Sequence, residues 1–287
     1  MKTTKNLTLA SSLSLLAVSV APSSALVVML SDLVPGDSPL ENYINDSFSN
    51  VTEIRHGNWA NFAASSDAIN GTGSFAGGGP ADVVIIGRSL SSGNYGSGAA
   101  DGYNGLAIPV VSLTSYTVRN IGGRMGWHAS GTTTGSLVAG AESTVTAAGA
   151  AIFGIGAGAQ DLLVASAAAA DTFNGLGATG SVGDGEILAT VGTDLLAVHW
   201  DAGDAPGDPA VANVATFGGP RLLFNLDNDP NAGNNGANDI ANMSPLGLQA
   251  LTNSIEFTTP LTANAVPEPS TSLLGLAALG LLARRRR

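Results

Sequence analysis

The chain contains no cysteine, few aromatic residues and few charged ones. Without cysteine it has no disulfide bond, no thiolate metal site and no thiol nucleophile. Aromatic residues make up 5% of the sequence and charged residues 11%, whereas apolar residues make up 44%. An apolar share of this size indicates a packed core and not disorder. The 38 glycines therefore indicate tight turns and closely packed elements.

Basic residues are nearly absent from the body of the chain, residues 26–265, which contains no lysine. Five arginines are opposed by 21 acidic residues there, which gives a formal charge of −16. Such a surface repels phosphate groups, so nucleic acid and anionic lipid are excluded as partners. The charge suits divalent cations, or simple solubility outside the cell.

The amino terminus has the three-part pattern of a secretory signal peptide. Lys2 and Lys5 precede an apolar run over residues 7–20, and small residues follow. Ser23 and Ala25 form a small-x-small cleavage site, so we expect residues 1–25 to be removed by the Sec translocon and signal peptidase. The alternative is an uncleaved anchor, but the run is shorter than the roughly 20 apolar residues of a membrane span.

The carboxyl terminus, residues 266–287, combines a proline-rich hexapeptide, a short apolar stretch at residues 273–283 and four arginines. Flanking residues and the arginine stems lengthen this stretch to a marginal transmembrane helix, with the arginines in the cytoplasm. The alternative is a basic amphipathic or disordered tail, but the stretch is apolar on all sides. The sorting-motif residues are Val266, Pro267, Glu268, Pro269, Arg284, Arg285, Arg286 and Arg287.

These residues resemble the PEP-CTERM tail of exported bacterial proteins. The resemblance implies that an exosortase-type enzyme recognises the tail at the inner membrane and cleaves it. We therefore expect a protein that is held transiently at the inner membrane and then reaches the cell surface or the extracellular matrix. The resemblance covers only the tail and implies nothing about chemistry in the body.

The body alternates strand and helix patterns. Continuous apolar runs at residues 25–30, 81–86 and 108–113 predict strands that are buried on both faces. Ser38-Pro39 predicts the start of a helix over residues 40–48. Strands separated by helical segments predict an α/β domain whose mostly parallel sheet has helices on both faces. Further predicted elements are strands at 51–55 and 221–226, an antiparallel pair of strands at 186–191 and 195–200, and a helix at 246–257, whereas residues 161–170 fit either a helix or a solvent-facing insertion.

Two late segments, 221–229 (RLLFNLDND) and 247–257 (GLQALTNSIEF), give a strand, an Asp-rich loop and a helix with the spacing L-x-x-x-I. In this order they resemble the class I glutamine amidotransferase-like (ThuA-like, flavodoxin-like) superfamily. The resemblance implies a flavodoxin-like three-layer sandwich with β-rich excursions. Its glutaminase branch needs a cysteine, so that chemistry is excluded. Ser89 in the segment GRSLS does not replace it, because the nucleophile-elbow pattern lacks its closing glycine.

Polar residues follow several predicted strands. Ligands of parallel α/β sheets collect at the carboxyl ends of the strands, so Asp32 and Arg88 are candidate ligand-binding residues, together with His56, Ser115 and Asp227. An arginine there would clamp a carboxylate, and the aspartates would bind a cation or sugar hydroxyls. The alternative is that these residues cap helices and bond loop amides.

The three histidines, His56, His128 and His199, lie far apart in the sequence and lack zinc-binding spacing. His128 is the candidate general base and joins Asp32 and Arg88 in the candidate ligand rim. The alternative is that the pairs Trp127-His128 and His199-Trp200 lie at strand edges without a catalytic role.

One loop has the spacing of a calcium ligand set. Asp227, Asp229 and Asn231 present oxygen atoms at alternating positions, as the start of an EF-hand does. The match then fails, because glycine comes one place late and the twelfth position is Asn238. These residues are a candidate Ca²⁺ site, and no other cofactor is predicted. The alternative is a solvated loop of Asx turns, which also applies to a second acidic loop at Asp201, Asp204 and Asp208.

Two functions fit the sequence. The first is a non-catalytic surface or matrix module with extracellular polysaccharide as a partner, since no complete catalytic motif is present. The second is a secreted hydrolase or carbohydrate-active enzyme that uses Asp32, His128 or Asp227 as acid or base. One pocket that holds Asp32, Arg88, His128 and Asp227 would favour the enzyme.

Overall fold

The fold was analysed in a computed structural model, which describes residues 24–31, 39–57, 59, 61–87, 95, 99–121, 124–130, 134–137, 142–163, 172–226, 240 and 243–264. Within these residues, nine strands form one large sheet and two form a separate small sheet. The predicted boundary between residues 25 and 26 falls at the start of the first strand. The sorting motif and the predicted tail helix lie outside the described residues.

One half of the large sheet is parallel. Its strands lie in the order β2-β1-β3-β4-β11, and each neighbouring pair is parallel. Strands β1 and β3 are buried along their whole length, which explains their continuous apolar sequences. The sequence predicted all five. Their bounds are β1 Ala25–Leu30, β2 Val51–Gly57, β3 Val83–Ile86, β4 Val110–Ser112 and β11 Arg221–Phe224.

The other half is antiparallel and continues the sheet in the order β11-β10-β9-β6-β7. The expectation of a mostly parallel sheet is therefore corrected: the β-rich excursions belong to the same sheet. The connection between β9 and β10 is too short for a parallel crossover, so it can form only a hairpin. The bounds are β6 Glu142–Val145, β7 Gly158–Asp161, β9 Glu186–Val191 and β10 Asp194–Trp200, and the small sheet pairs β5 Thr134–Leu137 with β8 Thr172–Gly175.

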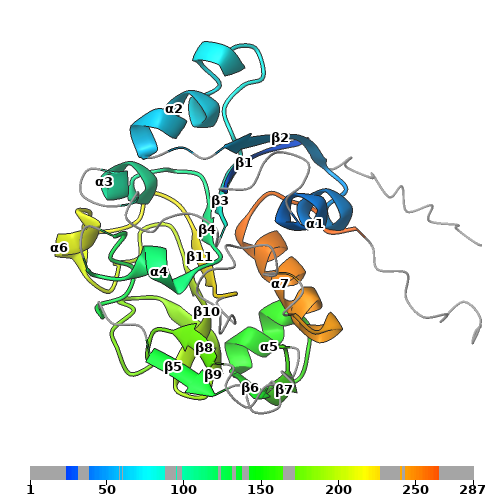
Figure 1. The fold of residues 1–287 in the computed structure, drawn as a ribbon, viewed down its shortest axis with the longest axis vertical. Helices are drawn as coiled ribbons and strands as arrows, with labels where there is room; N and C mark the ends of the chain where they lie inside the picture. The colour runs from blue at the N-terminus through cyan, green and yellow to red at the C-terminus, as the bar shows by residue number, and fades with distance from the viewer. Residues whose placement is uncertain are drawn as a thin grey trace, which may run out of the picture.

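Helices cover both faces of the large sheet (Figure 1). Helices α1, α5 and α7 pack on one face, and α2, α3, α4 and α6 lie on the other. A hydrophobic core lies on each face of the sheet, and alternate residues of β1 belong to different cores. Val27 packs with α1 on one face, whereas Val28 packs with α2 on the other. The bounds are α1 Pro39–Ser47, α2 Phe62–Asn70, α3 Ala99–Asn104, α4 Ser115–Val118, α5 Ala147–Phe153, α6 Pro209–Ala212 and α7 Pro245–Thr258, with a 3₁₀ turn at Gly73–Phe75.

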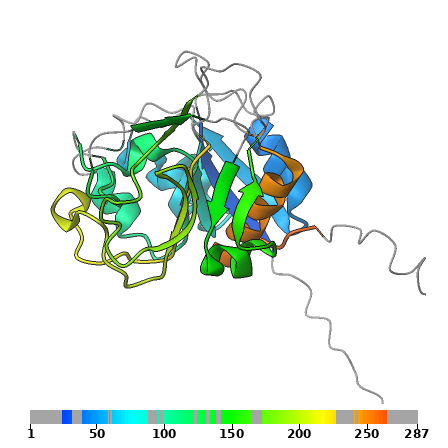
Figure 2. The same cartoon turned by 90° about the horizontal axis from the view of Figure 1, so that it is seen from below.

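Helices α1 and α7 lie side by side (Figure 2), and the Tyr43 hydroxyl lies 2.6 Å from Thr252 Oγ1 between them. Glycine lets α5 and α7 approach the antiparallel half closely. A β-carbon on Gly149 of α5 would overlap the carbonyl oxygen of Leu188 in β9, and one on Gly247 of α7 would overlap the carbonyl oxygen of Leu162. The small residues of this region therefore fix the positions of two helices.

Candidate functional site

The carboxyl ends of β1, β3, β4 and β11 meet at one edge of the sheet, which we call the carboxyl rim. Backbone bonds continue the sheet past the strand ends. Gly87 N donates to Leu30 O at 2.9 Å, and Leu226 N donates to Leu113 O at 3.1 Å. The chain leaves β1 toward β2 on one side but leaves β3 toward β4 on the other. Open α/β sheets bind ligands at such a reversal.

Buried polar groups stabilise the carboxyl rim. Asn225, which follows β11, accepts a hydrogen bond from Ser115 N at 3.1 Å through its side-chain oxygen. The Ser112 hydroxyl, at the end of β4, lies 2.7 Å from Thr117 Oγ1. Ser112, Ser115 and Asn225 are all 0% exposed. These groups therefore fix the turns after β4 and β11 and are closed to solvent.

The predicted rim residues Asp32, Arg88 and Asp227 lie outside the described residues. Asp32 and Arg88 directly follow Ser31 and Gly87 in the sequence, and these two neighbours lie at the reversal between β1 and β3. Ser31 is buried, with 2% of its surface exposed. The candidate Ca²⁺ ligands Asp227, Asp229 and Asn231 also lie outside the described residues.

His56 lies at the end of edge strand β2, opposite Met29 of β1. Both of its ring nitrogens are buried and have no hydrogen-bond partner among the described residues. Burial lowers the pKa of His56, and the negative charge of Glu41 partly opposes this shift. His56 is therefore a neutral histidine next to the carboxyl rim.

His128 joins two loops. Its Nδ1 accepts a hydrogen bond from Ser130 N at 2.9 Å, so the proton lies on Nε2, which donates to Gly177 O at 3.1 Å. Burial lowers the pKa of His128, although both hydrogen bonds oppose the shift. The side chain is closed to solvent, since the residue is 1% exposed. A proton-transfer role would require these bonds to break.

Two carboxylates of the second acidic loop, those of Asp204 and Asp208, bond backbone amides. Asp204 Oδ2 accepts from Asp201 N at 2.8 Å, and Asp208 Oδ1 caps α6 by accepting from Ala210 N at 3.2 Å. The bond of Asp208 is that of an Asx turn, whereas the bond of Asp204 reaches back three residues. In the part of the chain that the structure describes, no group of three or more histidine and acidic residues can hold a metal ion.

His199, in β10, contacts Phe257 of α7 edge to face, with ring centroids 5.0 Å apart. Burial lowers the pKa of His199, and Asp201, Asp204 and Glu186 oppose this shift. No described hydrogen bond connects His199 to the carboxyl rim, so the three histidines lie in three separate environments.

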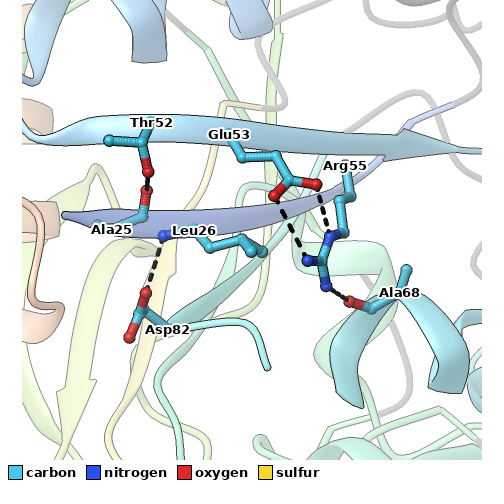
Figure 3. A network of polar contacts seen from close by, with 7 residues as sticks. All are labelled: Ala25, Leu26, Thr52, Glu53, Arg55, Ala68 and Asp82. Carbon is cyan, nitrogen blue, oxygen red and sulfur yellow. Dashed lines mark hydrogen bonds and ion pairs between the residues drawn. The ribbon is translucent and has the colours of Figure 1, made fainter. Parts of the chain in front are cut away.

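Sequence analysis missed two buried arginines. Arg55 of β2 is paired with Glu53, with Nε 2.9 Å from Oε1, and also donates to Ala68 O of α2 (Figure 3). Among the described residues, the Arg221 side chain donates only to backbone carbonyls, and its guanidinium lies over the Phe217 ring. Burial lowers the pKa of Arg221 to about 9. The sequence signal that could have indicated Arg221 is an arginine at the start of an otherwise apolar strand, RLLF.

Comparison with known proteins identifies the tail. A family model for the PEP-CTERM protein-sorting motif matches residues 265–287. No curated protein matches the chain. No described helix has the length and apolar character needed to cross a membrane. The match at residues 265–287 supports recognition by an exosortase-type enzyme, and the chain is an exported protein that this PEP-CTERM motif directs to the cell surface.

Proposed function

We propose that the body is a non-catalytic, flavodoxin-like display module that the tail delivers to the cell surface or the extracellular matrix. The strand order β2-β1-β3-β4-β11 supports this fold, since it corresponds to the doubly wound order 2-1-3-4-5. The antiparallel half then corresponds to the β-rich excursions. The glutamine amidotransferase-like resemblance agrees with this order but carries no cysteine chemistry here.

The non-catalytic proposal rests on one observation, that the polar groups of the carboxyl rim and of His128 form structural hydrogen bonds. Asn225 Oδ1 accepts from the backbone of Ser115 in the carboxyl rim, and both ring nitrogens of His128 join loops. A catalytic acid or base needs access to its substrate. Extracellular polysaccharide is the proposed partner of the module at its destination.

The test of this proposal is an activity screen of the exported, tail-processed protein against aryl esters and aryl glycosides. We expect no turnover above that of a heat-denatured sample. The alternative is a secreted hydrolase or carbohydrate-active enzyme, which the place of Asp32 and Arg88 after the strand reversal favours. Turnover that is lost in Asp32→Asn and kept in Asp201→Asn would establish the enzyme instead.

We further propose that the tail holds the protein in the inner membrane until the exosortase-type enzyme cleaves it. The apolar stretch at residues 273–283 and the following arginines support this stage. In cells without the sorting enzyme, the intact chain should stay in the membrane fraction, and a chain that lacks residues 266–287 should not. Equal retention of both chains at the envelope would contradict the proposal.

A further inference from the structure

The first and last described segments of the body meet at Asn50, in the turn before β2. The Asn50 carbonyl oxygen accepts a hydrogen bond from Ala25 N, at the start of β1, at 2.8 Å. Its side chain accepts from Thr262 N at 2.7 Å and donates to Pro260 O at 2.9 Å. Asn50 is 5% exposed. One buried residue therefore joins the start of β1 to the segment that follows α7.

Other contacts hold residues 260–264 against the end of α1, beside which this orange segment runs in Figure 1. Ser49 N donates to Thr262 O at 2.9 Å, and Asn264 N donates to Ser47 O at 2.7 Å. Leu261 is buried, with 2% of its surface exposed. We call residues 47–50 and 260–264 together the exit corner, because the sorting tail follows Asn264 directly.

The start of β1 is fixed beside the exit corner. Leu26 N donates to Asp82 Oδ2 at 2.8 Å, and Thr52 Oγ1 donates to Ala25 O at 3.3 Å (Figure 3). The predicted signal peptide precedes Leu26, so it joins the body at the same place as the tail. Because Ala25 and Val51 open the parallel strands β1 and β2, the exit corner lies at the edge of the sheet opposite the carboxyl rim.

We propose that the exit corner faces the bilayer while the tail is attached, and that the carboxyl rim therefore faces away from the membrane. This inference rests on the proposed membrane stage of sorting. Residues 265–272 separate the exit corner from the apolar stretch and extend to at most about 28 Å. A compact body of about 240 residues is roughly 45 Å across. The tether is therefore too short for the body to turn its carboxyl rim toward the bilayer.

The charge of the exit corner determines which kind of lipid surface it can approach. Residues 47–50 and 260–264 contain no ionisable side chain, in contrast to the strongly acidic body. The exposed carboxylates of Asp46 and Glu256 flank the corner, and they oppose adsorption to anionic lipid. The surface that fits is thus a neutral bilayer, approached through the tether and without insertion of the body.

The absence of native cysteine makes a direct test simple. Full-length Ser49→Cys, at the exposed exit corner, and Thr193→Cys, in the exposed β9–β10 turn at the opposite edge, each receive one fluorophore. The proteins are reconstituted in phosphatidylcholine vesicles that contain a lipid with a quencher on its headgroup. We expect at least twofold stronger quenching at residue 49 than at residue 193.

A matched control lengthens the tether without touching the body. Twenty Gly and Ser residues inserted between Asn264 and Ala265 add a coil of roughly 25 Å r.m.s. length, and the difference in quenching should then largely disappear. Equal quenching at both sites in the unmodified tether, with the protein still floating with the vesicles, would overturn the proposed orientation. If the full-length chain does not float with the vesicles, the proposed membrane stage itself fails, and the orientation fails with it.

Discussion

The parallel and antiparallel halves of the large sheet are built from different residues. In the parallel half, β1 (ALVVML) and β3 (VVII) bury every side chain. In the antiparallel half, β7 (GAQD) alternates between half-buried and exposed positions, and the helices above it approach through Gly149 and Gly247. The inner strands of the parallel half are thus stabilised mainly by branched apolar side chains, as is β10, which is buried along its whole length, whereas the outer part of the antiparallel half depends more on close contact between backbones.

The two halves also differ in what they place at their edges. The parallel half carries the carboxyl rim at one edge and, at the other, Asn50, which joins both ends of the described chain. The antiparallel half brings the turn between β9 and β10 to the same edge as the carboxyl rim, beside the end of β11. We infer that it widens and stabilises the sheet, while the parallel half determines how the body is attached and presented.

The largest expected effect concerns Arg221, at the seam between the halves. Strand β11 pairs with β4 on one side and β10 on the other. Arg221→Met would remove the charged donor of the carbonyl oxygens of Tyr103, Asn104 and Leu106, of which the first two keep a backbone donor. We expect the free energy of unfolding in urea to fall by about 3–5 kcal/mol, because several hydrogen bonds to a charged donor are lost at once, each worth about 1.5–3 kcal/mol.

The control for this prediction is Arg119→Met. Arg119 is half-buried and lies over the Tyr116 ring, with its guanidinium carbon 4.8 Å from the ring centroid. Its removal should cost less than about 1 kcal/mol. If both variants lost the same stability, the seam would not depend on the buried guanidinium.

The contrast in packing predicts the next largest effect. Gly149→Ala and Gly247→Ala each place a methyl group against a backbone carbonyl, that of Leu188 or Leu162, so each should destabilise the fold by about 1–3 kcal/mol through overpacking. Gly177→Ala is the matched control, because its β-carbon would meet nothing closer than Thr179 Oγ1 at 3.8 Å. Thermal unfolding of the three variants measures the difference. A tolerated Gly149→Ala would remove the evidence for close backbone packing in the antiparallel half.

The same contrast explains how much of the fold could be predicted. The strands of the parallel half and α7 have strong apolar patterns, and the structure contains them where the sequence predicted them. Helix α2 (FAASSDAIN) and strands β6 and β7 are rich in small residues, which give weak periodicity. Their positions depend on tertiary contacts, such as the capping of α2 by Asn61.

The carboxyl rim was predictable only in part, for a related reason. Ser115 was predicted there because it follows a strand, and it is the first residue of α4, the helix after β4. Its partner Asn225 is 110 residues away in the sequence, and no local pattern connects the two. Arg55 and Arg221 were missed in the same way, since the carbonyls that bind them come from other elements.

Histidine titration predicts a smaller effect that compares His56, in the parallel half, with His128, in a loop outside the large sheet. Burial lowers the pKa values of His56, His128 and His199, so the unfolded chain takes up protons before the folded one as the pH falls below about 6.5. Stability is thus fully present above that pH and is lost below it. Each histidine contributes a slope of at most about 1.4 kcal/mol per pH unit.

The measurement is urea unfolding between about pH 7.5 and 5.5, above the range of most carboxylates. His128→Gln should flatten the slope while keeping an acceptor and a donor. His56→Gln tests the parallel half, where the ring nitrogens have no described partner. A slope unchanged in both variants would mean that neither histidine is held neutral by the fold.

The smallest expected effect concerns calcium at the loop that follows β11, in the parallel half. If Asp227, Asp229 and Asn231 form a Ca²⁺ site, a chelator should lower the melting temperature of the exported protein. For a dissociation constant of about 1 mM, usual for extracellular modules, 1 mM Ca²⁺ stabilises by only about 0.4 kcal/mol. Asp227→Asn should abolish this response. Asp201→Asn should keep it, because Asp201 belongs to the second acidic loop, in which the carboxylates of Asp204 and Asp208 bond backbone amides. If a chelator leaves the melting temperature of the unmodified protein unchanged, the Asx-turn alternative holds for both loops. The two halves would then lack one chemical difference.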